Sequence, residues 1–109
     1  MAHKGTSTFV MQRASAVVLT PLILWFVASV VIHAGDSYAD ARAWLASPVT
    51  KMLFGALITV GAFHMRIGMH EVLADYFHGS LNRIFNTANW VFVVAVVAAT
   101  WLALFSIGT

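Results

Sequence analysis

One stretch of this sequence places several ionisable side chains in an otherwise apolar context. His64, Arg66, His70, Glu71 and Asp75 lie within 12 positions of one another. If the stretch is helical, at about 100° per residue, one face carries His64, Gly68, Glu71 and Asp75 within about 60° of arc, and Arg66 lies nearly opposite. An Arg or Asp at the centre of a membrane-spanning helix costs about 2.5–3.5 kcal/mol. The polar stripe is therefore expected to meet a polar surface or a cofactor, and not lipid.

His64 is the most informative of these residues. It precedes Asp75 by 11 positions, which is about 16 Å along a helix axis. A neutral imidazole so deep in a bilayer needs a partner for each ring nitrogen, and a metal is one such partner. Gly68, one turn away on the same face, would leave room for a flat haem. A hydrogen bond from His64 to a neighbouring helix, with Gly68 allowing close packing, fits the same spacing. A six-coordinate haem would also need a ligand from another chain.

Two further groups have two interpretations each. The hydroxyl of Tyr76 could donate a hydrogen bond to a quinone carbonyl beside Asp75, or Tyr76 could be an interfacial anchor next to a solvated helix end. Arg13 could pair with a haem propionate or with a lipid phosphate. The spacing alone leaves these alternatives open.

The composition indicates which solvent surrounds these groups. Of 109 residues, 61% are hydrophobic and 9% are charged, whereas an ordinary soluble domain has about 25% charged residues. A chain this short cannot bury so much apolar surface in a globular core, so lipid is the expected solvent. The net charge of +2 is dispersed, which argues against nucleic-acid binding. The absence of cysteine excludes disulfides and an iron–sulfur cluster held by this chain.

The positions of the charges locate the membrane spans. Ala14–Gly35 and Ile84–Thr109 lack Asp, Glu, Lys and Arg, and each covers the roughly 20 residues that cross a bilayer. The middle block, Met52–Met65, is charge-free for 14 residues and then continues as the polar stripe. We therefore predict an all-α membrane protein, a single domain over residues 1–109, with three transmembrane helices at about 14–34, 50–74 and 86–108.

The connections and the first block add three expectations. The first apolar run is longer than the roughly 7–15 residues of a signal-peptide core and has no A-x-A cleavage pattern, so it is expected to remain as a helix. Pro21 should kink it. The connection at 35–45 could form a short interfacial helix, with Tyr38 and Trp44 at headgroup level.

The basic residues indicate the orientation of the chain. Four of them lie on the side of the N-terminus and of the second connection, and two lie on the opposite side. The first group is Lys4, Arg13, Arg66 and Arg83, and the second is Arg42 and Lys51. The positive-inside rule then places the N-terminus in the cytoplasm and the C-terminus outside.

Two segments resemble a known family. Residues 64–78, HMRIGMHEVLADYFH, are similar to the signature of the small hydrophobic membrane anchor of succinate dehydrogenase, the D subunit of respiratory complex II. That signature is a His followed by G-L/M-x-x-V/I-L/I-x-D-Y. Residues 13–20, RASAVVLT, resemble the entry to the family's first helix, R-A/S-S/T-A-x-x-L. The two segments cover about a fifth of the chain, and the end of the first resembles the alphaproteobacterial branch.

The resemblance implies roles for individual residues. His64 matches the axial ligand of haem b, with a second axial His supplied by the larger cytochrome b anchor subunit, and Gly68 would let the haem pack. Tyr76 matches the residue that hydrogen-bonds ubiquinone, and Asp75 matches its acidic neighbour. Arg13 matches an Arg near the haem propionates. At 70–71 the family pattern has more neutral residues, and neither His70, Glu71 nor Arg66 receives a role.

The resemblance also implies the activity. The chain would be an anchor of succinate:ubiquinone oxidoreductase in the bacterial cytoplasmic (inner) membrane, with no catalytic residue of its own. FAD and iron–sulfur clusters would be carried by a flavoprotein subunit and an iron–sulfur subunit. The anchor of a fumarate reductase, or of another b-type cytochrome complex, is the nearest alternative. A small proton-coupled transporter is an alternative of a different class.

Overall fold

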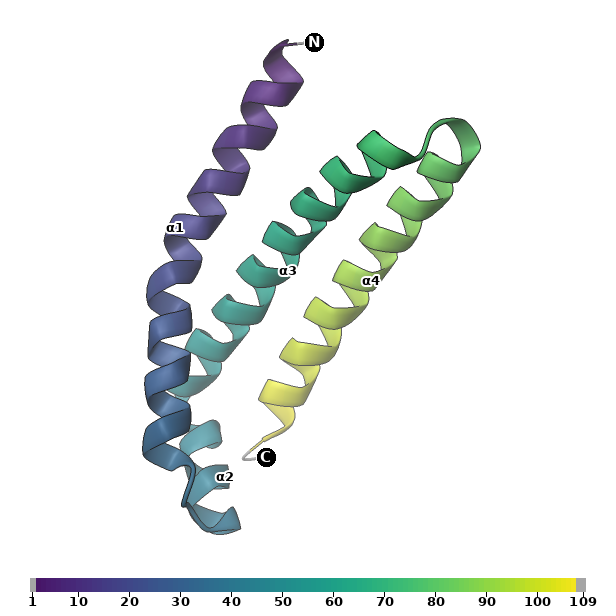
Figure 1. Ribbon diagram of the computed structural model, residues 1–109. Helices are drawn as coiled ribbons and strands as arrows, with labels where there is room; N and C mark the ends of the chain where they lie inside the picture. Colours follow the sequence, from purple (N-terminus) through teal and green to yellow (C-terminus); the bar gives the residue numbers. More distant parts are fainter. Residues whose placement is uncertain (1, 108–109) are drawn as a thin grey trace.

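The computed structural model describes residues 2–107 and consists of four helices (Figure 1). They are α1 (Ala2–His33), α2 (Tyr38–Ala46), α3 (Pro48–Tyr76) and α4 (Gly79–Ser106). Three of them, α1, α3 and α4, are long and apolar enough to cross a membrane. The described residues contain no strand, so the predicted all-α fold with three spans is confirmed.

The helices extend beyond the predicted boundaries. Helix α1 begins at Ala2 instead of residue 14, and α4 begins at Gly79 instead of residue 86. Charge-free runs mark the part of a helix that crosses hydrocarbon, whereas backbone hydrogen bonding continues into the polar interface. Helix α3 begins at Pro48, which suits the first helical position because its missing N–H would have no partner there. Helix α4 ends at Ser106, and the predicted end at residue 108 lies outside the described residues.

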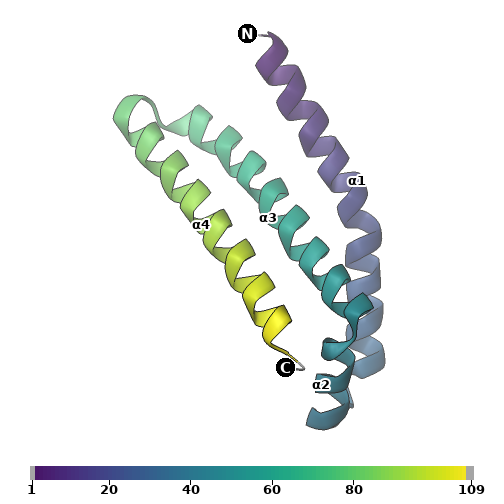
Figure 2. The ribbon, with the colours of Figure 1, turned by 180° about the vertical axis from the view of Figure 1, so that it is seen from behind.

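The central helix of the molecule is α3, which packs against α1 on one side and α4 on the other (Figures 1 and 2). Consecutive long helices are antiparallel. The start of α1 and the α3–α4 connection therefore lie at one end, whereas α2 and the end of α4 lie at the other. The molecule measures 51 × 25 × 20 Å along its principal axes. This topology matches the expected grouping of basic residues, and the orientation in the membrane stays a prediction.

Aromatic rings hold the end of the molecule that contains α2. The ring of Phe54 lies edge-on to Trp25 at 5.2 Å, to Phe26 at 5.7 Å and to Trp44 at 5.7 Å between centroids. Trp44 is on α2, the short helix expected at 35–45, and its ring stacks on His33 at 4.1 Å. One cluster of rings thus joins α1, α2 and α3.

Helices α3 and α4 approach closely at a glycine. A Cβ atom on Gly55 would overlap the ring of Trp101. The indole N–H of Trp101 donates to the hydroxyl of Thr59 at 3.0 Å, which fixes the ring over Gly55. At the same end the ammonium of Lys51 donates to the carbonyl of Ile107 at 2.6 Å.

Helix α1 runs through Pro21 without a break. The hydroxyl of Thr20 donates to the carbonyl of Ala16 at 2.9 Å, a bond that tends to bend helices. Figure 1 shows α1 curving gradually over the middle of its length, and the kink at Pro21 itself stays a prediction.

Candidate functional site

His64 faces α1 and is half-buried between the two helices. Its Nδ1 lies 2.7 Å from the hydroxyl of Ser15, and that hydroxyl donates to the carbonyl of Gln12 at 2.9 Å. A serine hydroxyl has a single proton to donate. Where the Ser15 hydroxyl gives its proton to the Gln12 carbonyl, the bond to His64 is made by a proton on Nδ1.

In that arrangement Nε2 is the ring nitrogen that keeps its lone pair. Among the described residues no group forms a hydrogen bond with Nε2. The two interpretations of His64 left open by its spacing thus concern different atoms: Nδ1 bonds to a neighbouring helix, and Nε2 keeps a lone pair. A histidine that binds a metal usually donates its other N–H in this way.

Ser15 is a residue whose role the sequence did not indicate. It lies inside the segment 13–20 that carries the family resemblance, but nothing in its type or spacing pairs it with His64. The pairing depends on the register between two antiparallel helices. That register is set by packing contacts far apart in the chain.

Gly68 also faces α1, one turn from His64. A Cβ atom at Gly68 would lie 3.5 Å from Nε2 of Gln12, an ordinary van der Waals distance. The side chain of Gln12 therefore occupies the space beside this glycine, and its Oε1 is buried without a hydrogen-bond partner among the described residues. Close packing of α1 on α3 accounts for what surrounds Gly68, and its role in haem packing stays a prediction.

Arg13 projects from the segment of α1 that contacts His64, and it is exposed. Its guanidinium lies over the ring of Phe9, with 5.1 Å between Cζ and the centroid. It forms no hydrogen bond or ion pair with another described residue. The guanidinium is thus available to an anion from outside the chain.

Asp75 and Tyr76 end α3, and Tyr76 is 75% exposed. Tyr76 lies 12 residues beyond His64, which is about 18 Å along the helix axis. The structure therefore places Tyr76 and His64 at different depths on one helix and does not bring them into contact.

The turn after Tyr76 is held by a side chain that the sequence did not single out. The amide nitrogen of Asn82 donates to the carbonyls of Leu73 at 3.0 Å and Phe77 at 3.1 Å, and so caps the end of α3. The chain then reverses at Gly79, whose φ of +65° is rarely adopted by other residues.

Arg66 lies on the opposite face of α3, as its angular position predicted. Its Cζ lies 4.1 Å from the ring centroid of Trp90 on α4, and its carbonyl accepts a hydrogen bond from Asn89 at 3.0 Å. His70 also contacts α4, through a bond of 2.8 Å between its Nδ1 and Oδ1 of Asn86. The C-terminal half of α3, residues 64–76, is here called its polar half. Its polar side chains contact α1 on one side and α4 on the other.

No three His, Asp or Glu side chains within the part of the chain that the structure describes could together hold a metal ion. A metal at His64 would therefore have one ligand from this chain. Haem, whose porphyrin supplies ligands of its own, would need only one such ligand from this chain.

Three apolar helices with polar groups in one half of the central helix define a small multi-pass membrane subunit. The model of the succinate dehydrogenase/fumarate reductase transmembrane subunit family matches residues 1–104. The chain belongs to this family, and it is a membrane anchor subunit that functions with other subunits.

A curated relative agrees with this assignment. The chain is 30% identical over 107 residues to the succinate dehydrogenase hydrophobic membrane anchor subunit of Paracoccus denitrificans, an alignment that covers 98% of this chain and 83% of the relative. The resemblance inferred from residues 13–20 and 64–78 is thereby confirmed for the family as a whole.

Proposed function

We propose that this anchor helps to bind haem b and forms part of the ubiquinone-reduction site of a bacterial succinate:ubiquinone oxidoreductase in the inner membrane. Flavin chemistry on succinate and the iron–sulfur relay belong to the flavoprotein and iron–sulfur subunits. A larger cytochrome b anchor completes the membrane part. The relative from Paracoccus, an anchor of succinate dehydrogenase, supports this assignment over a fumarate reductase anchor.

The observation that carries the haem assignment is the hydrogen bonding of His64. Ser15 and the Gln12 carbonyl leave the lone pair on Nε2, the atom through which His64 would ligate iron. Haem bound there would supply a centre for one-electron transfer between the iron–sulfur relay and quinone. A second ligand would come from a His of the larger cytochrome b anchor.

The other residues take roles according to their positions. The guanidinium of Arg13, two residues from Ser15 on α1, pairs with a haem propionate. Gly68 has no side chain, so the haem ring can approach the surface of α3 near His64. At the end of α3, Tyr76 donates its O–H to a quinone carbonyl. Asp75 orients a basic group of the partner anchor beside the quinone.

The test is the spectrum of the assembled complex with His64→Ala. We expect the low-spin b-type signal in the dithionite-reduced minus oxidised spectrum to be lost or converted to a five-coordinate form. His70→Ala is the matched control, because it removes a histidine of the same helix whose Nδ1 bonds to Asn86 on the other side. An unchanged spectrum in His64→Ala would show that another residue ligates the iron.

A further inference from the structure

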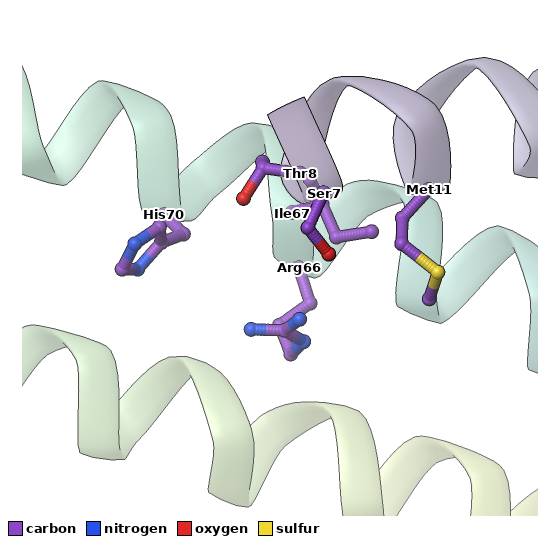
Figure 3. A pocket seen from close by; sticks show the side chains of 6 residues that line it. All are labelled: Ser7, Thr8, Met11, Arg66, Ile67 and His70. Carbon is purple, nitrogen blue, oxygen red and sulfur yellow. The ribbon is translucent and has the colours of Figure 1, made fainter. Parts of the chain in front are cut away.

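A pocket of about 330 Å³ lies between the N-terminal part of α1 and the C-terminal half of α3, and His64 is not among the residues that line it. It is lined by Ser7, Thr8, Met11, Arg66, Ile67 and His70 (Figure 3). The proposed haem and quinone roles use none of these residues. The chemistry of this lining therefore needs its own explanation.

Hydrogen-bond donors dominate the pocket. Figure 3 shows the hydroxyls of Ser7 and Thr8 and the guanidinium of Arg66 around the same space. The two hydroxyls form no hydrogen bond with another described residue. No Asp or Glu lines the pocket. An anion is the ligand that such a set recognises.

Arg66 itself lacks an anionic partner. Its Nε is buried without a hydrogen bond in the described part of the chain. The ion pair found among those residues, His33–Asp36, belongs to the other end of the molecule. The ring of Trp90 contacts the guanidinium at 4.1 Å and holds it in place, but it does not neutralise the charge. A charge at this depth is costly until a counter-charge meets it.

His70 forms the outer edge of the pocket in a fixed position. The side-chain nitrogen of Asn86 donates to the backbone carbonyl of Asn82 at 3.0 Å and to its Oδ1 at 2.9 Å. Oδ1 of Asn86 therefore accepts from Nδ1 of His70, at 2.8 Å. The imidazole is thus tied to α4 at the edge of the pocket.

The surface next to the pocket, toward the middle of the membrane, is apolar. Phe63 lies one turn from Ile67 on the same face of α3 and is 40% exposed, and Trp90 is 45% exposed. Their rings meet edge-on at 6.2 Å between centroids. A pocket lined by hydrogen-bond donors thus lies next to an exposed aromatic surface. The two surfaces match the two parts of a phospholipid, which has an anionic headgroup and apolar acyl chains.

We propose that this pocket binds the phosphate group of an anionic phospholipid, with an acyl chain lying along Phe63 and Trp90. Arg66 meets the phosphate charge, and the hydroxyls of Ser7 and Thr8 bond to its oxygens. The proposal is independent of the haem and quinone assignments, because it involves neither His64 nor Tyr76.

The experiment uses the whole complex, purified through this chain and delipidated in detergent. Phosphatidylglycerol is titrated into it, and bound lipid is counted by native mass spectrometry. We expect one saturable site, and Arg66→Gln to weaken its apparent Kd by about 10-fold or more. Arg83→Gln is the matched control, since it removes the same charge from the same end of the molecule without touching the pocket. It should leave the Kd of this site unchanged.

A second variant covers the case in which Arg66→Gln fails to assemble. Ser7→Ala with Thr8→Val keeps the charge and removes both hydroxyls, so the Kd should rise by about 3-fold to 10-fold.

Three outcomes would overturn the proposal. One is an unchanged Kd in both pocket variants. Another is displacement of the lipid by inorganic phosphate at the same concentration, which would indicate a site for free phosphate. The third is a wild-type complex that binds no lipid while Arg66→Gln releases another subunit, because a carboxylate of that subunit would then occupy the pocket.

Discussion

The two halves of α3 meet their neighbours in different ways. The N-terminal half is packed through aromatic rings, with Phe54 surrounded by rings of α1 and α2 and Gly55 covered by Trp101. The C-terminal half is joined to its neighbours by polar side chains, with His64 bonded to α1 and His70 to α4.

The two halves also differ in how completely their polar groups are satisfied. In the N-terminal half, the indole N–H of Trp101 and the ammonium of Lys51 both have acceptors. Among the described residues, the buried polar atoms without a partner are Oε1 of Gln12 and Nε of Arg66. Both lie at the level of the C-terminal half, where groups from outside the chain could meet them. We therefore expect the N-terminal half of α3 to stabilise the fold and its C-terminal half to bind ligands.

The largest effect should come from breaking the aromatic half. Gly55→Ala places a methyl group inside the ring of Trp101 and should destabilise the α3–α4 contact by about 1–3 kcal/mol, because the ring is held by Thr59 and must move. The measurement is the melting temperature of the purified complex.

Gly61→Ala is the matched control for this change. Its new Cβ would lie 3.7 Å from Cδ2 of Leu19, which is an ordinary contact. We expect a small change in melting temperature. Equal losses from the two variants would contradict the idea that stability is concentrated in the aromatic half.

A change in the polar half should affect the cofactor and not the melting of the helices. Ser15→Ala removes the hydroxyl that bonds to Nδ1 of His64. Loss of a hydrogen bond that orients a metal-binding histidine typically costs about 10-fold to 100-fold in metal affinity. We expect weaker haem retention on dilution and a shifted haem potential, and Ser15→Thr should restore both.

Thr20→Val controls for the loss of a hydroxyl from α1, since the Thr20 hydroxyl bonds only within its own helix. If Thr20→Val shifts the haem potential as far as Ser15→Ala does, the effect comes from helix bending and not from the bond to His64.

The smallest effect should come from the end of the polar half. Tyr76→Phe removes one hydroxyl, worth about 0.5–1.5 kcal/mol as a net hydrogen bond, so quinone reduction should fall several-fold. Succinate oxidation with an artificial acceptor should persist. The control is Tyr38→Phe, because Tyr38 is as exposed but lies at the opposite end of the molecule. Loss of both activities in Tyr76→Phe would indicate failed assembly, and no loss would make Tyr76 an interfacial anchor.

Features encoded by local composition could be predicted from the sequence. Apolar runs and charge positions gave the three spans and the short helix at α2, and the angular separation placed Arg66 away from His64. The early start of α1 was missed because the predicted span was counted from the charge-free run after Arg13, whereas the helix continues through Arg13 to the polar residues near the N-terminus.

Contacts between helices could not be predicted in the same way. Ser15 meets His64 across 49 positions of sequence, and Trp101 meets Thr59 across 42. Both pairs depend on the relative register of packed helices, which no local pattern in one sequence encodes. Asn82 was missed for a different reason: its role is to cap a helix that ends at the turn before it, and a single Asn in a polar turn has many possible partners.

The cap that Asn82 places on α3 has a consequence for binding at Tyr76. A ligand that must order a loop before it binds loses affinity to the entropy of that ordering. Here the last turn of α3 and the reversal at Gly79 are already fixed by bonds to Leu73 and Phe77. The backbone beneath Tyr76 is preorganised, so a ligand arriving there has only the tyrosine side chain left to immobilise.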